Sequence, residues 1–250
     1  MIKFLRFTLL LSFVFIASSC SCSKEDLINL NDELIEQNKE ILSKIEQYDD
    51  IEGLFNFYNT ITTDNINSFV LVESKNQINS LALYSDGVVV ANNGYDYYIL
   101  TDYNKIFQPG IVEYKIMDSN ANVYNAQVFK DNDVIYDSQT WLILLKVRIM
   151  NSYNVVMDSI SMGEISELVG HISSMEHINK VQLSENIKTS TIDYNNTSYN
   201  GYFLEDVNQR GGSLINLDNE LCGVYLSNIN SFIETKLIKE IVYSIYSLIL

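Results

Sequence analysis

The sequence predicts an all-β domain that follows a helical segment and ends in a C-terminal helix. From Ile66 onward, short Val, Ile, Leu and Tyr runs alternate with a period of two, and Asn, Asp, Ser and Gly clusters separate them. Many short strands at a spacing of about 8 to 12 residues are typical of sandwiches and barrels. Before Ile66, and again from about Glu234, the apolar period is that of a helix.

The chain begins with a segment that is typical of an export signal. Lys3 and Arg6 precede an apolar run over 7–17 that is too short to span a bilayer. The run ends in Ile16-Ala17-Ser18-Ser19-Cys20, which resembles the lipobox of bacterial lipoproteins. The resemblance implies that residues 1–19 are a signal peptide. It also implies that lipid on Cys20 holds the chain on the extracytoplasmic face of the cell membrane.

Two alternatives stay open at this end. Ala17 stands where leucine is commonest in a lipobox, and Cys22 is a second, poorer acceptor with Cys20 in its cleavage context. The other alternative is that the apolar N-terminal segment is not cleaved and itself anchors the chain. The rest of the chain then lies on the same extracytoplasmic side of the membrane as it would with a lipid anchor.

The composition excludes some partners. The formal net charge is −16, and removal of residues 1–19 leaves 14 basic against 32 acidic residues, a net charge of −18. Such a chain is repelled by nucleic acid and by anionic lipid. The acids are scattered, so they indicate a solvated surface, and we expect no metal site and no cofactor. Cys20, Cys22 and Cys222 imply no disulfide framework.

Residues 20–61 are predicted to form a lipid-anchored helical stalk. The apolar seam over 24–54 recurs every seven residues, as Leu27, Leu34, Ile41 and Tyr48, beside Ile28, Ile35 and Leu42, with Asn31, Asn38 and Ile45 completing it. A polar Asn in such a seam sets register and strand number. The pattern indicates either a coiled coil, which would make the chain a homo-oligomer, or an amphipathic helix packed on its own domain.

Residues 62–250 form the predicted β domain. Its strands are expected near 67–73, 79–84, 87–91, 96–101, 111–117, 122–129, 141–149, 155–160, 164–169, 180–187, 200–205, 213–216 and 221–227. An apolar stripe on the C-terminal helix, from Leu237 to Ile249, is expected to cover the core.

Five segments of this domain, in order, resemble the trypsin-like domain of HtrA or Deg-type serine proteases. They are Ser85-Asp86-Gly87-Val88-Val89-Val90 with Tyr98-Ile99-Leu100-Thr101, the hairpin at 114–116 and 124–128, Leu142-Ile143-Leu144-Leu145-Lys146-Val147, Gly163-Glu164 with Val169-Gly170, and the stretch 211–224. The resemblance covers about residue 62 to the end. It implies a trypsin-like double β-barrel of six strands each, with its site in the cleft between the barrels.

The residues at the family's catalytic positions differ from the family pattern. Asn104 stands where the family has its catalytic histidine, and Trp141 where it has the aspartate. Arg210 stands where the family has the nucleophilic serine. Asn208 replaces a glycine whose backbone N–H points at the oxyanion. Asn cannot act as a base, Trp cannot orient one, and Arg carries no nucleophile. The resemblance therefore predicts a pseudoprotease with no catalytic residues.

The same four residues are the candidate binding residues of the cleft. Arg210 either receives a carboxylate or an acidic peptide end, or pairs with Asp206 and plugs the cleft. Trp141 either binds a partner or fills the space that the histidine and aspartate leave. Two other sites are less favoured. A zinc site on His171, His177 and Asp206 is one, because the spacing of the two histidines does not suit a pair on one face of a helix. Ser213 as a nucleophile is the other, because it stands where the family has a buried proline.

The function predicted is a membrane-anchored lipoprotein whose inactive trypsin-like domain binds a protein or peptide, or serves as a scaffold. One alternative is an active extracytoplasmic serine protease. Another is a structural or adhesive surface lipoprotein that displays loops such as 188–200.

Overall fold

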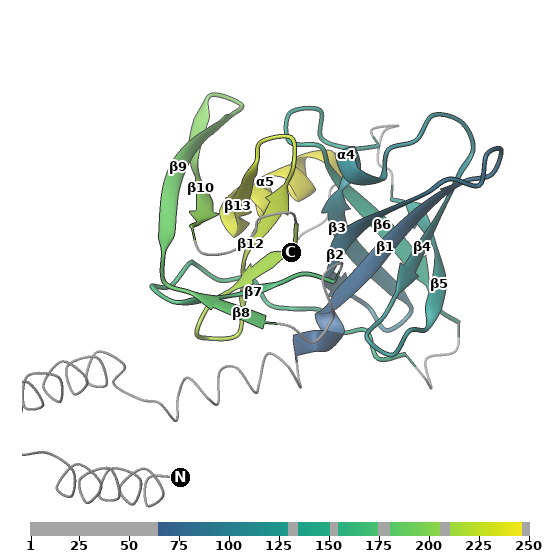
Figure 1. Ribbon diagram of the computed structural model, residues 1–250, viewed down its shortest axis with the longest axis horizontal. Coiled ribbons are helices and arrows are strands. Elements are labelled where there is room, and N and C mark those ends of the chain that lie inside the picture. The colour runs from purple at the N-terminus through teal and green to yellow at the C-terminus, as the bar shows by residue number, and fades with distance from the viewer. Residues whose placement is uncertain (1–64, 130–134, 151–154, 175–180, 206–210, 247–250) are drawn as a thin grey trace, which may run out of the picture. The chain divides into compact units, whose positions relative to one another are not determined.

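The computed structural model describes residues 65–129, 135–150, 155–174, 181–205 and 211–246, all within one compact unit of the chain, Leu54–Leu250. These residues form a closed six-stranded barrel, a seven-stranded sheet and few helices (Figure 1). The all-β prediction is therefore confirmed. The signal segment, Cys20 and the 20–61 stalk lie outside the described residues.

The barrel consists of antiparallel strands in the order β1-β2-β3-β6-β5-β4, and pairing of β4 with β1 closes it. The strands are β1 (Phe69–Asn76), β2 (Ala82–Asn92), β3 (Asp96–Asp102), β4 (Val112–Met117), β5 (Val123–Val128) and β6 (Leu142–Arg148). A 3-10 helix, η1 (Asn65–Ser68), precedes β1, and a one-turn helix, α4 (Tyr103–Ile106), follows β3.

Strand β6 is buried on both faces, which explains its unbroken apolar run. Ile143 and Leu145 belong to the core inside the barrel, whereas Leu142 and Leu144 belong to a second core that includes residues of the seven-stranded sheet and the C-terminal helix. Successive side chains of a strand point to opposite faces, so the part of a strand that lies between two cores needs apolar residues at every position. This holds for Leu142–Leu145, whereas Lys146 and Arg148 farther along β6 pair with Asp96. β6 thus joins the barrel to the rest of the domain.

The seven-stranded sheet has the order β8-β7-β11-β12-β13-β10-β9. Its strands are β7 (Val169–Ile172), β8 (Val181–Ser184), β9 (Ile187–Tyr194), β10 (Thr197–Leu204), β11 (Ser213–Ile215), β12 (Leu221–Leu226) and β13 (Ser231–Glu234). All of its strand pairs are antiparallel.

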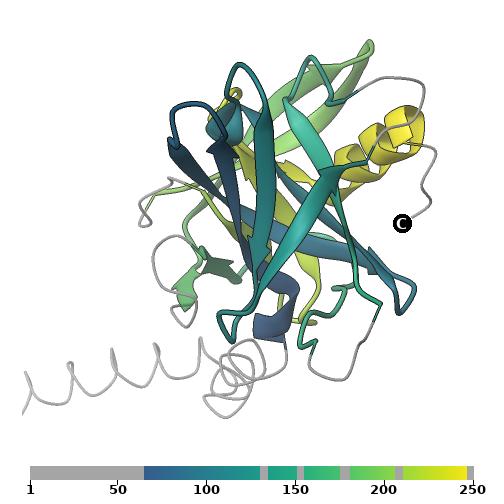
Figure 2. The same cartoon turned by 90° about the vertical axis from the view of Figure 1, so that its right-hand side faces the viewer.

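The predicted C-terminal helix is present as α5 (Thr235–Tyr246), which begins one residue later than expected. Four residues of the predicted stripe are fully buried and pack into the core that also holds Leu142 and Leu144 of the barrel; they are Leu237, Ile238, Ile241 and Val242. Figure 2 shows α5, in yellow, beside the barrel strands. Within the described ranges, no helix is both long and apolar enough to cross a membrane.

The predicted break between strands at 79–84 and 87–91 is wrong, because both belong to the continuous strand β2. Gly87 lies in the middle of this strand and not in a turn. A Cβ built there would lie 2.7 Å from Val72 Cγ2 and 2.9 Å from Ile99 Cγ2. Gly87 therefore gives room for neighbouring side chains inside the barrel.

Two further predicted strands are misplaced. Residues 155–160 pair with no strand in a ladder; instead the Asp158 N–H donates to the Asn67 carbonyl (3.2 Å) and the Ile160 N–H to the Val89 carbonyl (3.1 Å). The strand predicted at 164–169 is β7, which begins only at Val169.

The segment 180–200 also differs from the prediction. The strand expected at 180–187 ends at Ser184, and the expected loop at 188–200 is an antiparallel hairpin of β9 and β10. Its two turn residues, Asn195 and Asn196, have φ angles of 47° and 64°. Positive φ at both central residues defines the type I′ turn that suits a two-residue hairpin, and Asn accepts this conformation readily.

Candidate functional site

Helix α4 lies where the barrel meets the seven-stranded sheet, and a buried carboxylate holds it there. Asp102 Oδ1 accepts a hydrogen bond from the Asn104 N–H (2.9 Å), which caps the N-terminus of α4. Its second oxygen, Oδ2, accepts from the Ser227 N–H (2.7 Å), in the segment that follows β12. Only 2% of Asp102 is exposed, so both bonds are shielded from water.

Asn104, which the sequence resemblance predicts to replace a catalytic histidine, faces this same segment. The residue is exposed, and its Nδ2 donates to Ser227 Oγ (3.0 Å). An amide has no lone pair basic enough to take a proton near neutral pH. In this arrangement Asn104 links the barrel to the residue after β12.

Trp141 is presented by a tight turn at the start of β6. Asp137 Oδ2 accepts from both the N–H (2.7 Å) and the hydroxyl (2.6 Å) of Thr140, and the Trp141 N–H donates to the Asp137 carbonyl (2.7 Å). Trp141 has a φ of 63°, a left-handed conformation that is uncommon for so bulky a residue. Its own carbonyl accepts from the Tyr103 N–H (2.9 Å), which brings Trp141 next to α4.

The Trp141 ring belongs to an aromatic cluster that we define as Tyr103, Phe107, Tyr136 and Trp141. The Tyr103 and Tyr136 rings stack at 4.4 Å, and the Trp141 ring lies 5.2 Å from Tyr136 and 6.4 Å from Phe107. Tyr103 is buried, and burial is the main cause that raises the pKa of its hydroxyl, with Tyr136 adding to it. The other three rings are partly exposed and can contact a ligand.

The Asp137 turn also joins the aromatic cluster to the β9–β10 hairpin. Asp137 Oδ1 accepts from the Tyr194 hydroxyl (3.1 Å), and the Gln139 side chain donates to Asn195 Oδ1 (3.0 Å). Burial, followed by the charge of Asp137, raises the pKa of Tyr194 to about 12. The hairpin thus borders the turn that presents Trp141.

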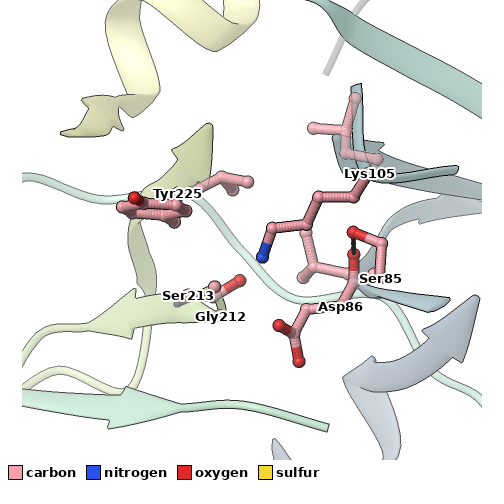
Figure 3. Close-up of a pocket in the computed structure, with 11 residues that line it drawn as sticks. Ser85, Asp86, Lys105, Gly212, Ser213 and Tyr225 are labelled. Carbon is pink, nitrogen blue, oxygen red and sulfur yellow. Dashed lines mark hydrogen bonds between the residues drawn. The ribbon is translucent and has the colours of Figure 1, made fainter. Parts of the chain in front are cut away.

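A small pocket lies beside α4, between the barrel and the sheet (Figure 3). The residues that line it include Ser85 and Asp86 of β2, Lys105 of α4, Gly212 just before β11, and Ser213 and Tyr225 of the sheet. Its volume suits about one water molecule, so it is a junction between the halves and not a ligand site.

Two charged side chains, Lys105 and Asp86, lie in this junction close to Gly211. Lys105 Nζ lies 5.4 Å from the centre of the Tyr225 ring, and Ser173 Oγ donates to Asp86 Oδ1 (2.9 Å). A Cβ at Gly211 would lie 2.2 Å from Asp86 Oδ2 and 2.7 Å from Lys105 Nζ. Gly211 therefore lets both charged side chains approach the backbone here.

Arg210 and Asn208 lie outside the described residues, as do His177 and Asp206. The residue directly after Arg210, however, is Gly211, which adjoins Lys105 of α4. The structure therefore places Asn104 on α4, Trp141 beside that helix, and Gly211 against the side chain of Lys105 of the same helix.

The two less favoured sites have their described members buried in the sheet. His171 is 1% exposed, and its Nε2 forms a hydrogen bond with the Gly211 carbonyl (2.9 Å). Ser213 is 3% exposed on β11, where it pairs with Ile172 of β7. Among the described residues, no three His, Cys, Asp or Glu side chains are arranged to hold a metal ion. The Cys222 thiol is buried, which raises its pKa to about 12 and keeps it protonated.

Sequence reasoning missed the residues that organise this site. Asp102 had a recognisable signal, since Asp is a preferred N-cap residue, but a helix of one turn leaves no apolar period to locate. Ser227 and Tyr194 had no local signal, because their partners lie 125 and 57 positions away in the sequence. Asp137 had one, since it also accepts from Thr140, three residues on, as Asp does in a turn. Comparison of the sequence with models of protein families and with curated proteins finds no match.

Proposed function

We propose that residues 62–250 are a trypsin-like double barrel without catalytic activity, and that the aromatic cluster beside Asn104 binds a protein or an extended peptide. The observation that carries the binding role is the partly exposed set of rings around Trp141, held by the Asp137 turn. Aromatic residues, above all Trp and Tyr, dominate the binding energy of protein interfaces because they bury a large area with few rotatable bonds.

The pairing of the strands supports a double barrel. In the barrel, six strands taken in chain order pair 1-2, 2-3, 3-6, 6-5, 5-4 and 4-1. In the sheet, β8 and β9 are separated by only two residues, 185 and 186. If β8 and β9 count as one interrupted strand, the sheet also has six strands in chain order, namely β7, β8/β9, β10, β11, β12 and β13. These six strands pair in the same order as the six strands of the barrel. Two halves with identical connectivity are what the family resemblance implies.

The chemistry at the family's triad positions supports a loss of catalysis. A serine-protease triad needs a neutral imidazole to take the proton from the serine and a carboxylate to orient that imidazole. Asn104 is held by Ser227, and Trp141 packs among other rings. The catalytic carboxylate, base and nucleophile would all have to come from other residues.

The charge of the chain narrows the class of partner. At a net charge of −16, or −18 once residues 1–19 are removed, long-range electrostatics attracts a basic protein and repels an acidic one. An acidic peptide end at Arg210 would be a local exception to this preference.

A peptide array tests the binding role. The full chain is incubated with arrayed extended peptides of varied sequence, and Trp141→Ala is compared with Tyr95→Ala, a substitution of a ring that is 63% exposed on the β2–β3 turn. We expect Trp141→Ala to abolish the selected signals and Tyr95→Ala to leave them. Equal signals for both variants would refute the proposed site, and binding that maps to the β9–β10 hairpin would favour the adhesive alternative.

A fluorophosphonate probe with labelled casein tests the loss of catalysis. We expect neither labelling nor cleavage, with an active HtrA-type protease as the positive control. Labelling of a single serine that casein cleavage also requires would identify a working protease and overturn the pseudoprotease proposal.

We further propose that the chain is a lipoprotein anchored through Cys20 on the extracytoplasmic face and that residues 24–54 assemble it. The lipobox-like end of the apolar N-terminus and the seven-residue seam support these two points. Palmitate labelling that Cys20→Ser abolishes and Cys22→Ser leaves would support the anchor. A monomer of the full chain in detergent would exclude the oligomer.

A further inference from the structure

The sequence contains two Asn-Gly pairs, and the structure places them in opposite surroundings. Asn93-Gly94 lies in the turn between β2 and β3, whereas Asn200-Gly201 lies inside β10. Both asparagine residues are exposed to solvent. The reactivity of each asparagine toward the glycine that follows it therefore depends on the backbone around the pair.

Two backbone N–H groups hold the Asn93 side chain in its turn. Asn93 Oδ1 accepts from the Asp96 N–H (2.8 Å) and from the Tyr95 N–H (3.1 Å). The Asn93 N–H donates to the Asp96 carbonyl (3.1 Å), which closes the turn. The Asn93 side chain is thus folded over the backbone that follows it, and two donors polarise its carbonyl group.

Gly94 leaves its backbone nitrogen open to reaction. It has a φ of 85°, and a Cβ built there would have no atom within 4 Å. Within the described part of the chain, no group accepts a hydrogen bond from the Gly94 N–H. Glycine also has no side chain that could shield this nitrogen. The nitrogen is therefore accessible to the carbonyl carbon of the Asn93 side chain.

We propose that Asn93 is a site of spontaneous deamidation, with the Gly94 nitrogen as the nucleophile. The nitrogen attacks Asn93 Cγ, the Cγ–Nδ2 bond breaks, and Nδ2 leaves as ammonia with the proton of the Gly94 N–H. Water then opens the cyclic succinimide. Hydrolysis of its bond to Cγ gives aspartate, and hydrolysis of its bond to the main-chain carbonyl carbon gives iso-aspartate. The reaction consumes water and releases ammonia, and it does not depend on the binding role proposed above.

The turn also favours the transition state of the cyclisation. Negative charge develops on Asn93 Oδ1 as the nitrogen adds to Cγ, and the two donors lie 2.8 and 3.1 Å from that oxygen. Backbone N–H groups at this distance stabilise a developing oxyanion. The reacting groups are held in one turn, so little entropy is lost when they meet.

The second pair is protected by the sheet. Gly201 is buried and pairs with Ser190 of β9 and with Ile233 of β13, so its strand has a neighbour on each side. Asn200 Nδ2 donates to Glu234 Oε2 (3.2 Å), which holds the side-chain amide. The Gly201 nitrogen can attack only after β10 has opened from the sheet.

The two products differ in their effect on the turn. Aspartate at position 93 keeps the oxygen that accepts from Tyr95 and Asp96, and it adds one negative charge to a net charge of −16. Iso-aspartate adds one carbon to the main chain and displaces the bond from residue 93 to the Asp96 carbonyl. Because Asp96 pairs with Lys146 and Arg148, we expect iso-aspartate to disturb this ion-pair group.

Mass spectrometry of the full chain tests the proposal. The native protein is kept at mildly alkaline pH in water enriched in heavy oxygen, which marks each carboxylate that forms during the experiment. A parallel sample is unfolded in guanidinium chloride, and both are digested so that the two Asn-Gly pairs are read separately. Asn93→Gln is the control variant, because its amide is one carbon too far from the Gly94 nitrogen to form a succinimide.

We expect Asn93 to react at least about tenfold faster than Asn200 in the native chain, because β10 must open before Asn200 can react. In the unfolded chain the two should react at similar rates, and Asn93→Gln should lose the label at position 93 alone. A native chain in which Asn93 stays an amide, while the unfolded chain reacts, overturns the proposal. Equal rates at both pairs in the native chain overturn the selectivity that we assign to the fold.

Discussion

Replacement of Asp102 by Ala should destabilise the domain by about 2–5 kcal/mol. The substitution removes the cap of α4, which is worth about 0.5–2 kcal/mol. It also removes the bond from the Ser227 N–H, and a hydrogen bond to a charged group contributes about 1.5–3 kcal/mol. Both N–H groups then lie unpaired in a region where Asp102 itself was 2% exposed.

Urea unfolding measures this effect in two ways. Far-UV circular dichroism follows the sheets, and Trp141 fluorescence follows the neighbourhood of α4, because Trp141 is the only tryptophan and accepts from the Tyr103 N–H. Asp102→Asn should lose less free energy of unfolding than Asp102→Ala, because it keeps one carbonyl oxygen as an acceptor.

Asp193→Ala is the matched control. This exposed carboxylate accepts from Ser198 Oγ (2.7 Å), and its loss should cost less than about 0.5 kcal/mol. If Asp102→Ala and Asp193→Ala lower the free energy of unfolding by the same amount, then Asp102 does not tie α4 to the segment after β12.

Three further predictions concern the sheet and its buried groups. Gly212→Ala should destabilise by about 2 kcal/mol or more in the same assay, because a Cβ there would lie 2.2 Å from the Ile172 carbonyl oxygen at a φ of 91°; unchanged stability would show that β7 and β11 lie farther apart. Cys222 should react with a thiol reagent far more slowly in the native protein than in urea at pH 8, because burial raises its pKa to about 12; equal rates would contradict its burial. Four tyrosines with pKa values raised to about 12, mainly by burial, should titrate late in absorbance at 295 nm; they are Tyr114, Tyr124, Tyr194 and Tyr202. Since the folded state favours their neutral form, the stability that they contribute is present below pH 10 and falls as the pH rises from about 10 to 12; titration of all tyrosines near pH 10 in the native protein would argue against these environments.

The periodic parts of the fold were predictable from the sequence. Strands β3 and β6 lie within a residue or two of their predicted bounds, and helix α5 begins one residue after its predicted start. Each has a strong apolar pattern, set by the core that it faces, and such a pattern is local in sequence. The two buried faces of β6 appear directly as its unbroken run of apolar residues.

Elements with a weak pattern were not predictable. Ser85-Asp86-Gly87 has the composition of a turn, yet it continues β2, because Gly87 is needed where Val72 and Ile99 approach. The β9 strand is largely exposed and polar, so the hairpin around Asn195 and Asn196 carries the composition of a loop. In both places the neighbouring strands decide the conformation and local propensity does not.

The same division applies to the candidate site. The family resemblance pointed to Asn104 and Trp141, and both lie in the region where the barrel meets the sheet. The carboxylates that organise this region, Asp102 and Asp137, act on Ser227 and Tyr194 from distant parts of the chain.

By itself, the sequence determined the β content, the C-terminal helix and the acidic charge, because each of these is a property of composition or of local period. Only the tertiary structure decided the closure of the barrel, the pairing order of the sheet and the aromatic cluster around Trp141. These features depend on hydrogen bonds and contacts between residues far apart in sequence, which no local pattern records.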